Sequence, residues 1–175
     1  MYIFESKNIA YREMTLDDTD NVLMWRNNDD VAKNFFYKES ITRETHVAYY
    51  ENFIKTGKSI QFVMKDKKTG IEFGCVYFSH VNRELKTGEI GIFIANSSFR
   101  GKGYGTEALR ALGEFGFDEL KFSRVDARVK RDNICSIKSL LKIGYKENME
   151  LLESSDFDGN IDDVVFMSLN VEVDK

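Results

Sequence analysis

The chain has 175 residues, of which 42% are hydrophobic and 31% are charged, and its formal net charge is −4. This length and composition predict one domain over residues 1–175 with enough apolar side chains for a sizeable core. The acidic balance argues against a general nucleic-acid binder, so any anion-binding capacity is expected to be local.

The sequence also argues against a membrane or secreted protein. It contains no run of about 18 apolar residues, and residues 1–7 lack the basic and apolar regions of a secretory signal. Cys75 and Cys135 lie in apolar surroundings without metal-ligand spacing, which predicts reduced thiols in or near the core and no metal site. We therefore expect a cytoplasmic protein.

In the first half of the chain we expect three strands and two helices. Residues 9–14 read as a strand, and a capping box at residues 15–18 starts a helix that ends at residues 27–30. Thr42 is expected to cap a second helix that stops at Gly57. The last two strands, at 60–65 and 71–79, form a hairpin around a turn at 67–70.

The second half of the chain alternates strands and helices. We expect strands over 86–95 and 124–129, helices over 103–119 and 133–144, and a final antiparallel pair over 145–152 and 161–169 with its turn at 158–160. Strands of this order with interspersed helices predict an α/β or α+β domain, in which helices cover both faces of a mixed sheet.

A glycine-rich turn follows the strand at 86–95 and opens the next helix. It consists of Arg100, Gly101, Lys102, Gly103, Tyr104, Gly105 and Thr106. At such a turn the backbone N–H groups and the helix dipole converge on one place, and glycine lets the main chain approach an anion closely. This turn predicts a site for a pyrophosphate-bearing cofactor. Local anion-binding capacity is expected here and at the basic pair Lys130 and Arg131.

The element order and two motifs resemble the GCN5-related N-acetyltransferase (GNAT) superfamily over essentially the whole chain. The turn matches the acyl-CoA motif of that family, and Asn133 to Ser136 opens a helix ending in residues 140–145, like the family's Asn-x-x-Ser…Leu-x-Lys-x-Gly-Phe. Residues 158–167 resemble the closing hairpin of the branch that acetylates ribosomal-protein N-termini, polyamines and amino sugars. The resemblance implies a mostly antiparallel sheet of seven strands, four flanking helices, and a cleft between the fourth and fifth strands for acetyl-CoA.

Within that cleft the resemblance implies a role for each motif. The pantetheine amides would pair with the backbone of Ile92, Phe93 and Ile94, and the pyrophosphate would lie on the N–H groups of residues 100–106. Asn133 would face the pantetheine arm, with a plain helix N-cap as the alternative, and Ser136 would contact CoA or pack within its helix.

The implied chemistry is acyl transfer from a thioester to an amine, which needs a base and a stabilised leaving thiolate. Glu89, on the strand that lines the cleft, is the candidate base, and the alternative is a strand-end glutamate that faces solvent. Many family members carry an acidic tyrosine seven residues after the motif asparagine, where this chain has Leu140. Ser139 is a candidate substitute, although a thiolate with a pKa near about 8.5 can leave with modest help.

Arg26 and His80 are the candidate acceptor-binding residues. Residues 25–46 resemble the subgroup that acetylates nucleotide-linked amino sugars, and Arg26 would suit a diphosphate; the alternative is a surface arginine paired with Asp29, Asp30 or Glu51. His80 is expected in the connection that borders the acceptor cleft. An amino-sugar nucleotide, a protein N-terminus and a polyamine stay open as acceptors. A non-catalytic acyl-CoA-binding module is the other class, and residues 161–169 are expected to pair across a homodimer.

Overall fold

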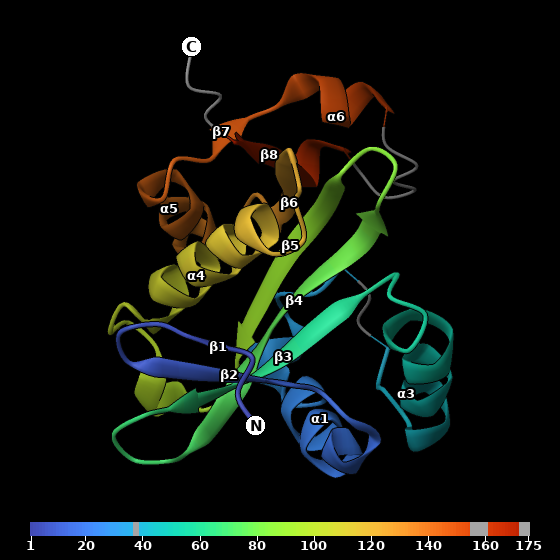
Figure 1. Cartoon of the computed structure of the whole chain (residues 1–175), viewed down its shortest axis with the longest axis vertical. Helices are drawn as coiled ribbons and strands as arrows, with labels where there is room; N and C mark the ends of the chain where they lie inside the picture. Colours follow the sequence, from blue (N-terminus) through green and yellow to red (C-terminus); the bar gives the residue numbers. More distant parts are fainter. Residues whose placement is uncertain (37–38, 155–160, 172–175) are drawn as a thin grey trace.

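The computed structural model of the chain describes residues 1–36, 39–154 and 161–171. Its centre is a sheet in the order β1-β2-β3-β4-β5-β6-β8-β7 (Figure 1). Neighbouring strands are antiparallel except β5 and β6, which run parallel. The strands are β1 (Phe4–Glu5), β2 (Ile9–Glu13), β3 (Ile60–Asp66), β4 (Glu72–Asn82), β5 (Thr87–Ile94), β6 (Arg124–Lys130), β7 (Lys146–Glu147) and β8 (Val164–Asn170).

Helical segments lie between the strands, and the longest of them is α4. They are η1 (Leu16–Asp18), α1 (Thr19–Arg26), α2 (Asp29–Ala32), α3 (Arg43–Tyr49), the π-helical η2 (Tyr50–Ile54), η3 (Ser97–Phe99), α4 (Tyr104–Asp118), α5 (Ile134–Lys142), α6 (Met149–Ser154) and η4 (Ile161–Asp163). Local signals set several boundaries as predicted. The Thr15 N–H donates to Asp18 Oδ2 at 2.8 Å, and the Thr42 hydroxyl accepts the Thr45 N–H at 3.2 Å.

The predicted layered fold is confirmed, with differences at its ends. Phe4–Glu5 adds an edge strand beside β2, so the described sheet has eight strands instead of seven. The strand expected over 145–152 shrinks to β7, because residues 149–154 form α6, and the described chain holds six α-helices instead of four. The turn expected at 158–160 lies outside the described residues. In the described sheet β8 lies between β6 and β7 and not at an edge. The expected pairing of residues 161–169 across a homodimer stays a prediction.

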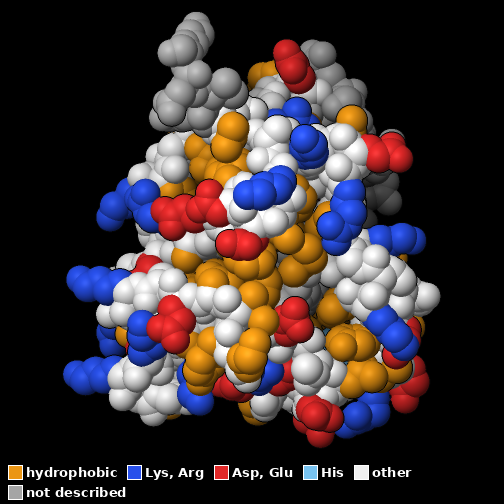
Figure 2. All heavy atoms as spheres, viewed as in Figure 1, with side chains coloured by type: hydrophobic (Ala, Val, Ile, Leu, Met, Phe, Trp, Pro, Cys, Tyr) orange, Lys and Arg blue, Asp and Glu red, His pale blue; other side chains and the backbone are white. Residues whose placement is uncertain are grey.

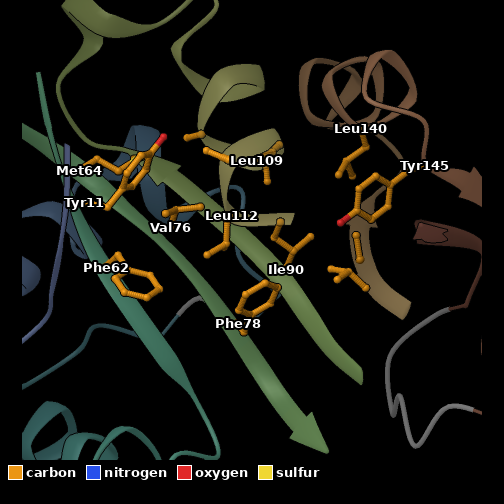
Figure 3. Packing of buried hydrophobic residues seen from close by; sticks show 14 of the residues in the cluster. Tyr11, Phe62, Met64, Val76, Phe78, Ile90, Leu109, Leu112, Leu140 and Tyr145 are labelled. Atoms are coloured by element: carbon orange, nitrogen blue, oxygen red, sulfur yellow. The ribbon is translucent and has the colours of Figure 1, made fainter. Parts of the chain in front are cut away.

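Helices cover both faces of the sheet. On one face α4 lies over β4 and β5, above a core that includes Val76, Phe78 and Leu112 (Figures 1 and 3). On the other face α1 and α2 cover a second buried cluster that includes Trp25 and Phe93. Because side chains alternate along a strand, Glu89, like Phe93, faces the α1 side.

β5 and β6 pair at only one end, and this opens the sheet. Their register runs from Thr87 opposite Arg124 to Glu89 opposite Asp126. Beyond Glu89, β5 pairs with β4 alone, and the rest of β6 pairs with β8. The strands diverge from this point, which confirms the cleft predicted between the strands at 86–95 and 124–129.

The surface carries charges of both signs. Figure 2 shows hydrophobic side chains gathered in a band through the middle of one face, with basic and acidic side chains interspersed around it. Within the described residues, no helix combines the length and apolar character needed to cross a membrane.

Candidate active site

A cavity of about 680 Å³ occupies the divergence of β5 and β6. The two strands form its sides, residues 100–109 and α5 border it on one face of the sheet, and residues 30–36 border it on the other. It therefore connects the two faces. The cofactor residues predicted from sequence that line it are Ile92, Phe93, Ile94, Arg100, Gly101, Gly103, Gly105, Thr106, Asn133 and Ser136.

The glycine turn has the geometry of an anion cradle. Gly101 and Gly103 have backbone φ angles of +71° and +87°, which residues other than glycine rarely adopt. A Cβ built on either glycine would meet nothing within 4 Å, so the space beside the turn is open to a ligand. The first N–H groups of α4 have no acceptor within their own helix, and the helix dipole favours negative charge there.

Side chains of the turn contribute differently from what the sequence predicts. The Arg100 Nε–H donates to the Ile94 carbonyl at 2.9 Å, and Nη2 donates to the Ala95 carbonyl at 3.3 Å, so this guanidinium fixes the turn to the end of β5. The Tyr104 hydroxyl donates to Asp66 at 2.7 Å, and neither Tyr104 nor the exposed Lys102 lines the cavity. The cradle therefore depends on backbone groups more than on these side chains.

α5 borders the cavity with small polar residues. Asn133 accepts the Ser136 N–H at 3.3 Å, so it caps the helix as well as lining the cavity. The Thr106 hydroxyl donates to Ser139 Oγ at 3.1 Å and ties α4 to α5. Cys135 is exposed and lines the cavity, so the prediction that it lies in or near the core is wrong, whereas Cys75 is buried as predicted.

Leu140 is buried near the C-terminal end of α5. Many members of the GNAT family carry a tyrosine that acts as an acid at this position. Leu140 packs near Tyr145 (Figure 3). The Tyr145 hydroxyl is buried without a hydrogen-bond partner in the described chain, and burial raises its pKa. Tyr145 does not line the cavity, so it does not replace the missing acid.

Glu89 lies where β5 and β6 begin to diverge. Its Oε2 is 2.7 Å from Arg128 Nε on β6, and its Oε1 is 3.9 Å from His80 Nδ1. His80 is not in the connection predicted for it: it lies within β4, at an irregularity of the β4–β5 register, with φ of +50°. Such a bulge redirects a side chain, and here the imidazole lies beside the candidate base.

Arg26 is partly buried against aromatic rings and has no ionic partner among the residues that the structure describes. Its Cζ lies 3.5 Å from the centroid of the Phe35 ring and 5.8 Å from that of Phe93. Its Nε is buried without a hydrogen-bond partner, and its guanidinium forms no ion pair within residues 1–36, 39–154 and 161–171. It therefore pairs with none of the carboxylates considered in the sequence analysis. Burial lowers its pKa, but a guanidinium stays charged at neutral pH.

A family model described as the acetyltransferase (GNAT) domain matches residues 8–146. The chain belongs to the GNAT family. It is 26% identical over 171 residues to the uncharacterized N-acetyltransferase p20 of Bacillus licheniformis. This alignment covers 94% of this chain and 93% of that protein. It is also 24% identical over 148 residues to the uncharacterized N-acetyltransferase YoaA of Bacillus subtilis, over 83% of each chain.

Solved GNAT structures share the fold. A spermidine N-acetyltransferase from Vibrio cholerae, in complex with CoA and spermine, superposes with a TM-score of 0.81 at 19% identity, over 94% of this chain and 96% of that chain. A domain from Methanocaldococcus jannaschii superposes with a TM-score of 0.77 at 20% identity, over 93% of this chain and 98% of that one.

As a GNAT enzyme, this protein is an acetyl-CoA-dependent N-acetyltransferase. Its residues fit the cosubstrate. The open glycine turn at the start of α4 suits a pyrophosphate, and the edge of β5 that β6 leaves unpaired suits the pantetheine amides. Arg100 occupies the Ile94 carbonyl, and the Phe93 carbonyl points toward Gly74 of β4. Because backbone groups alternate in direction along a strand, Ile92 is the better candidate for that pairing.

Three parts of the GNAT site were missed from the sequence. No motif marks residues 33–36, which border the cavity, or Tyr77, whose ring covers Gly91 so closely that a Cβ there would lie 2.3 Å from Tyr77 Cζ. Arg128 could have been predicted from the sequence, because charged and apolar residues alternate along β6 and place Arg128 on the same face as Asp126 and Lys130.

Proposed function

We propose that this enzyme transfers the acetyl group to a primary amine by direct attack, with Glu89 as the base. The position of Glu89 carries the proposal. It lies at the point where the strands diverge and on the face opposite α4, whereas the glycine turn expected to hold CoA begins α4. A carboxylate on that face is placed to meet an amine that enters from the α1 side. Direct attack requires no nucleophilic side chain.

The proton of the acceptor ammonium must leave before its nitrogen attacks. Arg128 engages Oε2 of Glu89, so Oε1 is the oxygen available to accept the proton, directly or through one water. His80 lies beside Oε1 and is largely exposed, which supports a route for the proton from Glu89 to solvent. Bound acetyl-CoA supplies the thioester, and the protein brings base and amine to one end of the cleft.

The leaving thiolate receives less help than in relatives with a tyrosine, because Leu140 stands at that position. Ser139 accepts the Thr106 hydroxyl, which leaves its own hydroxyl hydrogen free to point into the cavity. We assign Ser139 the role of hydrogen-bond donor to the sulfur. A thiol with a pKa of about 8.5 can leave as the thiolate at neutral pH with little more help than this hydrogen bond.

Different observations favour three acceptor classes. The V. cholerae neighbour is a spermidine N-acetyltransferase, which favours a polyamine. The motif around Arg26 favours a nucleotide-linked amino sugar, and the closing segment also favours a protein N-terminus. These acceptors differ in charge, and the electrostatics of the cleft bears on the choice.

Thiol release from acetyl-CoA tests the proposal, with spermidine, a nucleotide-linked amino sugar, and peptides with Ser or Ala N-termini as acceptors. We expect Glu89→Gln to lower kcat by about 10² to 10⁴ while acetyl-CoA affinity is kept, because the amide cannot accept the proton. Glu84→Gln, at an exposed turn, is the control. Unchanged turnover in Glu89→Gln would remove Glu89 as base. No release with any amine, despite acetyl-CoA binding, would favour a binding module.

A further inference from the structure

The acceptor side of the cleft holds a positive charge that no carboxylate of the described residues neutralises. Arg26 lies on α1 directly behind the Phe35 ring, and that ring lines the cavity. The groups around the guanidinium include the phenols of Tyr49 and Tyr77. His46, which is buried nearby, has a pKa lowered by burial and by Arg26, so it is uncharged at neutral pH and does not neutralise the guanidinium.

An enclosed guanidinium normally has a carboxylate partner, because a charge removed from water without one is costly. Arg12 follows this rule, with Asp18 at 2.6 Å and Glu72 at 2.7 Å. Among the described residues Arg26 contacts aromatic rings and no carboxylate, and the attraction to Phe35 offsets part of the cost of burial. The arrangement leaves the charge available to an anion that arrives with a ligand.

Lys130 adds a second cation, which lines the cavity itself. Its Nζ donates to the Lys33 carbonyl at 2.9 Å and forms no ion pair with a carboxylate of the described chain. The carboxylates that line the cavity are matched: Glu89 by Arg128 at 2.7 Å, and Asp30 by Lys33 at 2.8 Å. The acceptor end of the cleft is therefore positive.

We propose that the acceptor is a primary amine that also carries an anionic group, a phosphate or a carboxylate, and that Arg26 and Lys130 select it. This inference rests on the proposed acetyl transfer, because it names the acceptor class of the same cleft. The anion lies between Lys130 and the Phe35 ring in front of Arg26 while the amine reaches Glu89. A polyamine is disfavoured, because its distal ammonium groups would face both cations.

Matched amines that differ in charge test the proposal. Glucosamine 6-phosphate is compared with glucosamine, and alanine with alaninamide, each by thiol release from acetyl-CoA, with spermidine as the polycationic member. We expect one anionic amine to exceed its neutral partner in kcat/KM by at least about tenfold and spermidine to be poorest, since tenfold corresponds to one modest charge interaction. The two pairs distinguish a phosphate from a carboxylate.

Variants locate the selection. Arg26→Gln and Lys130→Met should each reduce the ratio of kcat/KM between the anionic amine and its neutral partner about tenfold, and Arg26→Lys should restore part of that ratio. Arg43→Gln is the matched control, because Arg43 is an exposed arginine of α3 paired with Asp20. Acetyl-CoA affinity verifies that each variant is folded.

The results separate this inference from the function on which it rests. If spermidine or a neutral amine is turned over better than both anionic amines, the inference is overturned and acetyl transfer stands. A native ratio in Arg26→Gln and in Lys130→Met would overturn their selecting role. If no amine releases thiol from a protein that binds acetyl-CoA, the proposed function fails and the acceptor inference fails with it.

Discussion

At the residue scale, the candidate base depends on its neighbour across the opening of the sheet. Arg128 belongs to the strand that stops pairing with β5 at Glu89, so their ion pair spans the start of the cleft. Arg128 Nε lies 2.7 Å from Oε2 in an ion pair without hydrogen-bond geometry, and Oε1 lies toward His80. Because proton transfer is sensitive to small errors in position, this contact is expected to matter for turnover more than for folding.

Replacing this neighbour tests the positioning role. We expect Arg128→Met to lower kcat about ten- to a hundredfold, with acetyl-CoA affinity and the acceptor KM nearly unchanged, because the carboxylate loses its fixed orientation. Arg128→Lys should recover part of the rate. Arg124→Met, on the same face of β6 but paired with Asp126, is the control. A loss confined to acetyl-CoA affinity, with no recovery by lysine, would contradict the assignment.

At the element scale, the CoA cradle belongs to the junction between β5 and α4. Arg100 holds the turn against the end of β5. Glu107, in the first turn of α4, accepts hydrogen bonds from the Ser6 hydroxyl at 2.7 Å and from the Asn8 N–H at 2.6 Å. The start of the helix is thus attached to the sheet on two sides, which keeps its free N–H groups aimed at one place.

A single glycine in this junction provides the test. Gly103→Glu should abolish measurable acetyl-CoA binding by calorimetry, because it strains a φ of +87° and puts bulk and negative charge where the pyrophosphate is expected. Gly113→Ala is the control: it lies within α4, its added Cβ meets nothing within 4 Å, and it should keep binding. Normal binding by Gly103→Glu would show that the cradle is elsewhere.

At the scale of the whole molecule, the sheet separates the expected CoA side from the acceptor side, and the cleft joins them. The N-terminal elements that cover the acceptor side are fastened by Arg12 of β2, which binds Asp18 of η1 and Glu72 of β4. Burial alone would raise the pKa of Asp18. The bonds from Arg12 and from the Thr15 N–H outweigh burial and hold that pKa below its ordinary value.

This pair makes stability depend on pH. A carboxyl whose pKa is lower in the folded state stabilises the fold above its unfolded pKa of about 3.9, and the contribution is lost as the pH falls through the folded value. We expect Asp18→Asn to lower the free energy of unfolding by about 3 kcal/mol at pH 7, since it leaves Arg12 with one partner. In urea titrations the difference in the free energy of unfolding between Asp18→Asn and the unsubstituted protein should become smaller below about pH 4. A difference that stays constant in acid would contradict this account.

Features that a few neighbouring residues encode can be predicted from the sequence. The capping box at Thr42, the hairpin after β3, and the left-handed glycines of the turn follow from local backbone and side-chain chemistry. Combined, they predicted the layered fold and the cradle, whereas the cleft was predicted from the resemblance to the GNAT family. The resemblance to the GNAT family also led to Glu89, on the strand that lines the cleft.

The surroundings of those features depend on tertiary contacts, which the sequence did not predict. Phe35 lies over Arg26, Arg128 reaches Glu89, and His80 enters β4 through a bulge, although nothing in the local sequence requires these contacts. They depend on strand register and on where β5 and β6 stop pairing, and both are set by packing across the whole sheet. The charge of this end of the cleft, on which the proposed acceptor class rests, is therefore a property of the assembled fold.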